Sequence, residues 1–164
     1  MSAVPDIRVH SDSQAVADAA AAFVLEVGKE AIRTKGRFFI ALSGGTTPAT
    51  LYRALTSHTV TDRLDWSRTT FFFSDERCVP PDDPRSNYAL AKKALFTPLN
   101  IAPSQVYRMA GESKDPQAAA TEYEQQIRLA TNTFSSAPPS LDLILLGLGE
   151  DGHTASLFPG ASVL

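Results

Sequence analysis

Three short runs of the chain are almost wholly apolar or β-branched, and amphipathic stretches separate them. The runs lie at residues 37–43, 69–75 and 141–149. Apolar runs of this length without polar alternation are typical of strands that are buried on both faces of a parallel sheet. We therefore expect three buried strands, together with a short extended segment at residues 7–12 that could add a fourth.

Helices are expected between these strands. From Val16 to Ala31, apolar residues recur at steps of three and four, which predicts a helix with Asp12 or Ser13 as its N-cap and Gly36 just past its end. Further helices are expected over residues 49–57, over 88–96 with Ser86 or Asn87 as N-cap, and over 115–134 with Pro116 in the first turn, and loops over 79–87 and 135–140. Strands separated by helices predict an α/β fold with a mostly parallel sheet, in which ligands bind at the carboxyl ends of strands.

Composition narrows the class of protein. A chain of 164 residues with 43% hydrophobic and 20% charged residues fits one domain with a packed core. The formal net charge is -3 and no cluster of Lys and Arg occurs, so we expect no nucleic-acid partner. Cys78 is the single cysteine, which excludes an internal disulfide and suits a reducing compartment; we expect it to be a small buried residue. Without a signal-peptide pattern, and without an apolar run near the length of about 20 residues that a membrane span needs, a cytoplasmic location with no membrane contact is expected.

The first chemical motif, SGGTTP at residues 43–48, follows the first strand. Gly44 and Gly45 allow a ligand to approach the backbone, and the amides that follow open a helix, where the dipole favours an anion. Thr46 and Thr47 add hydroxyl donors. The motif lacks the Gly-Lys-Ser/Thr of a Walker A loop. A plain strand-to-helix turn remains the alternative.

The second motif, SDERCVP at residues 74–80, follows the second strand. The carboxylate of Asp75 and the guanidinium of Arg77 could bind the hydroxyls and the phosphate of a sugar phosphate. A surface ion pair at the end of the sheet is the alternative.

The third motif, LGLGEDGHTASLFPG at residues 146–160, follows the third strand. Its glycines match G-x-G-x-x-G, but a dinucleotide site also needs a carboxylate about 20 residues further on, and no acidic residue follows Asp151. The favoured interpretation is a tight turn that presents Asp151 and His153 at a helix start, where the dipole keeps the imidazole neutral for general-base catalysis. No second His or Cys lies at metal-ligand spacing from His153, so no metal site is expected. A structural histidine is the alternative, and we assign His10 and His58 to that class.

Four stretches together, ALSGGTTP, FFFSDERCVP, RSNY and LGLGEDGHTASLFPG, resemble the 6-phosphogluconolactonases, whose superfamily includes glucosamine-6-phosphate deaminase/isomerase. The resemblance runs along essentially the whole chain, in the order of the family. It implies a modified Rossmann-like α/β/α sandwich with a mostly parallel sheet (NagB-like). It also implies a cytosolic enzyme of the pentose phosphate pathway that hydrolyses 6-phospho-glucono-1,5-lactone without a metal or organic cofactor.

The resemblance also implies roles for individual residues. His153 is the base that activates water, Asp151 orients the imidazole or binds a hydroxyl, and Arg77 or backbone amides near Gly149 meet the negative charge on the lactone oxygen. The implied substrate-binding residues are Ser43, Gly44, Gly45, Thr46, Asp75, Asn87 and Gly149.

Two departures qualify the resemblance. The deaminase/isomerase continues after DGH with Asn-Glu-Pro, whereas Leu157, Phe158 and Pro159 stand here, and a phenylalanine cannot transfer a proton. This favours the lactonase over the deaminase. A sugar-phosphate sensor domain is a further alternative, but such domains normally follow a DNA-binding helix-turn-helix, and no basic segment precedes residue 7. The family usually continues well beyond SLFPG, so we expect residues 1–164 to form one α/β sugar-phosphate-binding domain that is incomplete at its C-terminus and weaker than a full-length homologue in stability and activity.

Overall fold

A parallel sheet lies at the centre of the protein. The computed structural model describes residues 4–57 and 63–162, and within them three strands pair in the order β2-β1-β3. β1 (Phe38–Leu42) pairs along its whole length with β2 (Thr69–Phe73), and two of its residues pair with β3 (Leu143–Ile144). All pairings are parallel, as the apolar runs predicted.

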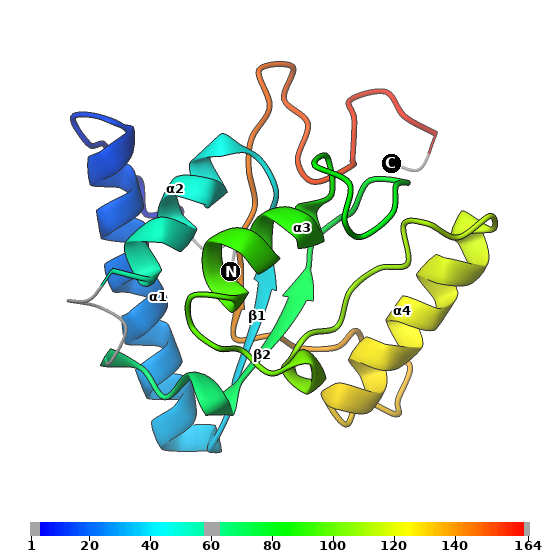
Figure 1. Ribbon diagram of the computed structural model, residues 1–164, viewed down its shortest axis with the longest axis horizontal. Coiled ribbons are helices and arrows are strands. Elements are labelled where there is room, and N and C mark those ends of the chain that lie inside the picture. Colours follow the sequence, from blue (N-terminus) through cyan, green and yellow to red (C-terminus); the bar gives the residue numbers. More distant parts are fainter. Residues whose placement is uncertain (1–3, 58–62, 163–164) are drawn as a thin grey trace.

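Helices cover both faces of this sheet. Phe38, Ile40 and Leu42 point to one face, where they pack in a large core with residues of α1 (Ser13–Lys35), α2 (Thr46–Leu55), α3 (Asn87–Ala91) and η3 (Lys92–Phe96). Phe39 and Ala41 point to the other face and pack with residues of α4 (Pro116–Ala130). Figure 1 shows α1 and α2 side by side on one side of the sheet and α4 on the other. Two short 3-10 helices complete the described elements: η2 (Trp66–Arg68) and η4 (Pro103–Gln105). The expected α/β sandwich is confirmed.

Side-chain caps set the helix ends. Asp12, rather than Ser13, caps α1 by accepting the N–H of Ala15 at 2.8 Å, and Gly36 follows the helix in the left-handed conformation with φ 72°. Ser86, rather than Asn87, caps α3, whose helical path continues after Ala91 as the π-helix η3. Asp115 caps α4, with Pro116 in its first turn as predicted.

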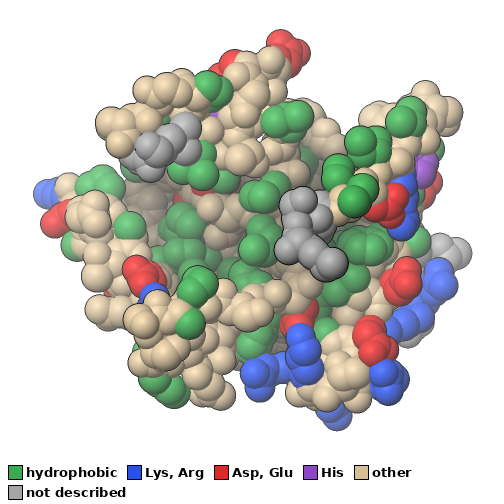
Figure 2. Space-filling model, turned by 180° about the vertical axis from the view of Figure 1, so that it is seen from behind, with side chains coloured by type: hydrophobic (Ala, Val, Ile, Leu, Met, Phe, Trp, Pro, Cys, Tyr) green, Lys and Arg blue, Asp and Glu red, His purple; other side chains and the backbone are tan. Residues whose placement is uncertain are grey.

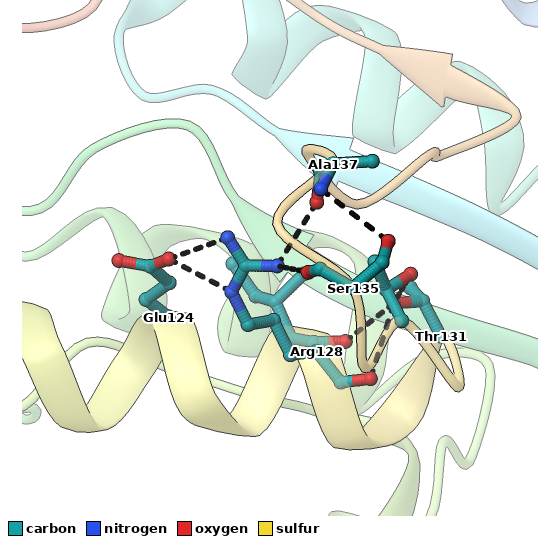
Figure 3. A network of polar contacts seen from close by, with 7 residues as sticks. Glu124, Arg128, Thr131, Ser135 and Ala137 are labelled. Atoms are coloured by element: carbon teal, nitrogen blue, oxygen red, sulfur yellow. Dashed lines mark hydrogen bonds and ion pairs between the residues drawn. The ribbon is translucent and has the colours of Figure 1, made fainter.

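The end of α4 is tied to the loop that leads toward β3. Arg128 pairs with Glu124 one turn earlier in the helix, and its Nη1 donates to the carbonyl oxygens of Ser135 and Ala137 at 3.1 and 3.0 Å (Figure 3). This network closes the turn between helix and strand. None of the described helices has the length and apolar character needed to cross a bilayer.

The third strand differs from the expectation. Residues 141–149 were predicted to be a buried strand, but β3 spans two residues, Ile144 is 53% exposed and Leu148 is 83% exposed. The reason is that β3 lies at the edge of the sheet, and no described residue pairs with its outer side.

Two smaller expectations are also wrong. Residues 7–12 do not join the sheet, and Ile7 and Val9 are exposed. Cys78 is exposed rather than buried. His10 is exposed on the segment before α1, and His58 lies outside the described residues.

Candidate functional site

A pocket opens where the carboxyl ends of β1 and β2 meet the turn that follows β3. Its volume is ≈ 710 Å³, and α1 contributes an apolar side that includes Phe23. Most of the predicted site residues line this pocket: Ser43, Gly44, Gly45, Thr46, Asp75, Arg77, Gly149 and His153. Asn87 lies buried behind the lining, and Asp151 stands outside it on the surface of the turn. The three motifs therefore converge at one end of the sheet, as the parallel topology requires.

The glycine loop presents unpaired backbone N–H groups at the start of α2. Gly45 is the N-cap of the helix, with φ 104°, and it supplies no side chain to cap it. Within the described residues, no hydrogen bond engages the N–H groups of Gly45, Thr46 or Thr47. Free amides at the positive end of a helix dipole favour a bound anion.

Two buried tyrosines hold the strand ends that carry the motifs. The hydroxyl of Tyr52 donates to the carbonyl oxygen of Ser43 at 2.6 Å and accepts its N–H at 3.2 Å. Tyr123 makes the same pair of bonds to Phe73, at 3.0 and 2.7 Å. Burial raises the pKa of both hydroxyls above the ordinary value, so both stay protonated donors. Sequence reasoning missed this role because both tyrosines fit the apolar faces of their helices.

Asn87 supports the glycine loop from behind. Its side chain is 1% exposed, and its Nδ2 donates to the carbonyl oxygen and to Oδ1 of Asp75 at 3.0 and 3.1 Å. The Oδ1 of Asn87 lies where a side chain at residue 44 would be, because a Cβ on Gly44 would come within 1.7 Å of it. Only glycine fits at this position.

Glu76, for which the sequence analysis predicts no separate role, joins β2 to α3. Its Oε1 accepts the N–H groups of Arg77 and Asn87 at 2.8 and 2.7 Å, and its Oε2 accepts the Ser86 hydroxyl and the Tyr88 N–H, both at 2.9 Å. Because these four donors engage both oxygens of the carboxylate, we assign Glu76 a structural role, which is to hold the end of β2 to the start of α3. Its neighbours in the same motif, Asp75 and Arg77, face the pocket.

Arg77 supplies the positive charge among the predicted pocket residues. Its Nη1 donates to the carbonyl oxygen of Arg85 at 2.7 Å, which orients the guanidinium from the far side of the loop. The group remains able to bind an anionic oxygen in the pocket through its other donors.

His153 is held by its own turn. Its Nδ1 lies 2.5 Å from Oδ1 of Asp151, and its ring stacks on Phe158 with the ring centroids 4.7 Å apart. The hydrogen bond with His153 lowers the pKa of the Asp151 carboxyl, which is therefore ionised near neutral pH and accepts a hydrogen bond from Nδ1–H. This leaves Nε2 as the basic nitrogen of the neutral ring.

The turn itself differs from the one expected. No helix begins after His153 in the described part of the chain; a bridge between Thr154 and Leu157 closes a tight turn in which Ala155 has φ 49°. The helix-dipole account of a neutral His153 is therefore wrong, and the ring is oriented by Asp151. The N–H of Gly149 donates to the carbonyl oxygen of His153 at 2.8 Å, so this amide is engaged within the turn.

Across residues 4–57 and 63–162, no group of three or more His, Cys, Asp or Glu side chains is placed to hold a metal ion.

Comparison with known proteins agrees with this arrangement of motifs. The family model described as glucosamine-6-phosphate isomerases/6-phosphogluconolactonase matches residues 11–164. The chain belongs to this family. It is 45% identical over 152 residues to a 6-phosphogluconolactonase of Treponema pallidum, covering 93% of this chain and 60% of the relative. It is 40% identical over 134 residues to a 6-phosphogluconolactonase of Nostoc, covering 82% and 54%.

Solved structures show the same fold. A 6-phosphogluconolactonase from Trypanosoma cruzi superposes with a TM-score of 0.83 at 34% identity, covering 99% of this chain and 65% of that one. A monomeric glucosamine-6-phosphate deaminase of the NagB superfamily superposes with a TM-score of 0.74 at 25% identity, covering 88% and 56%. The fold is thus that of the NagB superfamily. In these comparisons the chain spans between about half and two thirds of the length of its relatives.

Proposed function

We propose that the pocket hydrolyses a phosphorylated sugar lactone, 6-phospho-glucono-1,5-lactone, and that this chain carries the reactive part of a 6-phosphogluconolactonase. One observation carries the proposal: a histidine whose Nδ1 is held by a carboxylate lines the same pocket as the unpaired amides at the start of α2. A base and an anion site in one pocket suit a substrate with an electrophilic carbonyl and a phosphate.

In this proposal, the phosphate binds at the amides of Gly44, Gly45 and Thr46. Nε2 of His153 takes a proton from a water molecule, which attacks the lactone carbonyl carbon. The imidazolium that forms is stabilised by the ionised Asp151, as its close contact with Nδ1 supports. Arg77 binds the oxygen on which negative charge develops. The bond between the carbonyl carbon and the ring oxygen then breaks, and the imidazolium gives its proton to that leaving oxygen, which releases 6-phosphogluconate and restores the base.

A glucosamine-6-phosphate deaminase is the second candidate, since a deaminase is among the structural neighbours. The ring of Phe158, which stacks on His153, supports the lactonase instead. An apolar ring at this place shields one face of the base and supplies no second proton-transfer group for opening a sugar ring.

The decisive experiment follows lactone hydrolysis at low temperature with the purified chain, against the spontaneous background. We expect His153→Asn to lose about 10²–10⁴-fold in rate, because an amide of similar size is not a base. Binding of 6-phosphogluconate should persist, since the amides of the glycine loop are untouched. Glucosamine 6-phosphate should release no ammonia.

His10→Asn is the matched control, because His10 is exposed on the segment before α1 and takes no part in the pocket. It should hydrolyse the lactone like the unaltered chain. A rate at background in the unaltered chain, or an unchanged rate in His153→Asn, would contradict the proposal. Release of ammonia would favour the deaminase.

A cytoplasmic location, independence of any cofactor and the absence of a nucleic-acid partner remain predictions.

A further inference from the structure

The segment that carries His153 is joined to the rest of the protein by very few polar contacts. Residues 147–162 make hydrogen bonds among themselves, such as Thr154 Oγ1 to the carbonyl oxygen of Gly147 at 2.9 Å. Within the described parts of the chain, one hydrogen bond leaves this segment: the Ser156 hydroxyl donates to Oδ2 of Asp75 at 2.8 Å, across 81 positions of sequence.

Asp75 is a firm anchor for this bond. Its Oδ1 and its carbonyl oxygen both accept from Nδ2 of the buried Asn87. Two residues earlier, Phe73 is held on both its N–H and its carbonyl oxygen by Tyr123. The end of β2 is therefore held by several hydrogen bonds of its own, whereas the turn is held to it by the Ser156 bond.

The same bond connects the two halves of the pocket. Asn87 packs against Gly44, so Ser156, Asp75, Asn87 and Gly44 form a continuous path from the His153 turn to the glycine loop. Ser156 is three residues beyond His153 and lies inside the turn that the Thr154–Leu157 bridge closes, so this bridge ties the position of Ser156 to the residue that follows His153.

We propose that Ser156 is a positioning residue, which holds the His153 turn over the glycine-loop pocket by binding Asp75. The proposal rests on the proposed function in so far as His153 is the base. Without the Ser156 hydroxyl the turn samples positions in which His153 no longer reaches the reacting water, whereas the amides that bind the phosphate stay in place. The rate of the chemical step falls, and substrate binding changes little.

The test compares Ser156→Ala with Ser156→Thr, which retains a hydroxyl. Ser135→Ala is the control, because Ser135 is exposed beyond the end of α4 and its hydroxyl accepts only the local N–H of Ala137. The first readout is amide hydrogen exchange of peptides within residues 147–162, which needs no enzymatic activity. We expect at least about fivefold faster exchange in Ser156→Ala, with unchanged exchange in α2 and β1, and values like the unaltered chain in the other two variants.

The second readout is the kinetics of lactone hydrolysis. In Ser156→Ala, kcat should fall about tenfold while KM stays within about twofold, and Ser156→Thr should restore most of kcat. Unchanged exchange in Ser156→Ala overturns the proposal whether or not the chain is a lactonase. Faster exchange with an unchanged kcat also overturns it, because the bond would then hold the turn without positioning the base. If the unaltered chain lacks lactonase activity, the proposed function fails, and so does the positioning role, even where exchange shows that the contact holds the turn.

Discussion

Gly149 lies against the imidazole of His153. A Cβ at Gly149 would come within 2.1 Å of Nδ1 and 2.8 Å of Oδ1 of Asp151, closer than packed atoms approach. The glycine therefore leaves the space in which the histidine and the aspartate meet. Its role is to admit a side chain, which differs from the nucleotide-binding role that the G-x-G-x-x-G spacing suggests in other folds.

We predict that Gly149→Ala displaces the imidazole from Asp151. Lactone hydrolysis should fall at least about tenfold, since small misplacements of a catalytic group cost rate steeply. The displacement itself can be followed by the NMR resonances of the His153 ring. Gly147→Ala is the structural control, because nothing lies within 4 Å of a Cβ at that position, and its His153 resonances should match those of the unaltered chain. Equal ring resonances in all three proteins would count against this account.

At the scale of the elements, Glu76 joins the end of β2 to the start of α3. Three of the four hydrogen bonds to its carboxylate fix Ser86, Asn87 and Tyr88 relative to the strand. Because Asn87 in turn supports Gly44, this anchor also sets the glycine loop. A short helix of five residues thereby contributes to the pocket without lining it.

We predict that Glu76→Gln lowers the free energy of unfolding by about 1–3 kcal/mol, because the amide nitrogen would face backbone N–H donors and leave them unpaired. Urea denaturation followed by circular dichroism measures the change. The matched control is Glu124→Gln on α4, whose carboxylate pairs with Arg128 at the surface (Figure 3) and should matter by less than about 1 kcal/mol. Similar losses of unfolding free energy in the two variants would show that the Glu76 carboxylate stabilises the protein no more than a surface ion pair does.

At the scale of the whole molecule, one edge of the sheet is open in the described part of the chain. β3 pairs with β1 on one side only, and Ile144, Leu146 and Leu148 are 53%, 58% and 83% exposed. Figure 2 shows hydrophobic side chains gathered around a hollow on the rear face of the molecule. Unpaired strand edges flanked by apolar side chains are prone to pair with another chain.

We predict that the 164-residue chain self-associates as its concentration rises, and that Leu148→Lys weakens this association, because a charge at the edge opposes pairing. Sedimentation velocity over a range of concentrations measures the effect. Leu129→Lys is the control: Leu129 is 64% exposed on α4, away from the open edge, and its replacement should leave association unchanged. A chain that stays monomeric at every concentration would refute the prediction.

Local sequence determined much of this protein. The apolar runs placed β1 and β2, the three- and four-residue periodicity placed α1, and Pro116 lies in the first turn of α4 as expected. Asp12 and Ser86 are two of the predicted N-cap candidates. The convergence of the three motifs was predictable too, because parallel strands put their carboxyl ends at one edge. These features depend on side chains within a few residues of one another, which is the range over which periodicity and capping act.

Only the tertiary structure decided the rest. The exposure of β3 depends on what lies beside it in the sheet, and an apolar run is the same whether or not a neighbour covers it. Asp75 and Glu76 are adjacent in one motif but have different roles: Asp75 faces the pocket, and Glu76 binds the start of α3. The difference follows from the direction in which each side chain points at the end of the strand. The bond from Ser156 to Asp75 joins residues 81 positions apart, and no local pattern marks either as a partner of the other, since contacts of that range arise only when the chain packs.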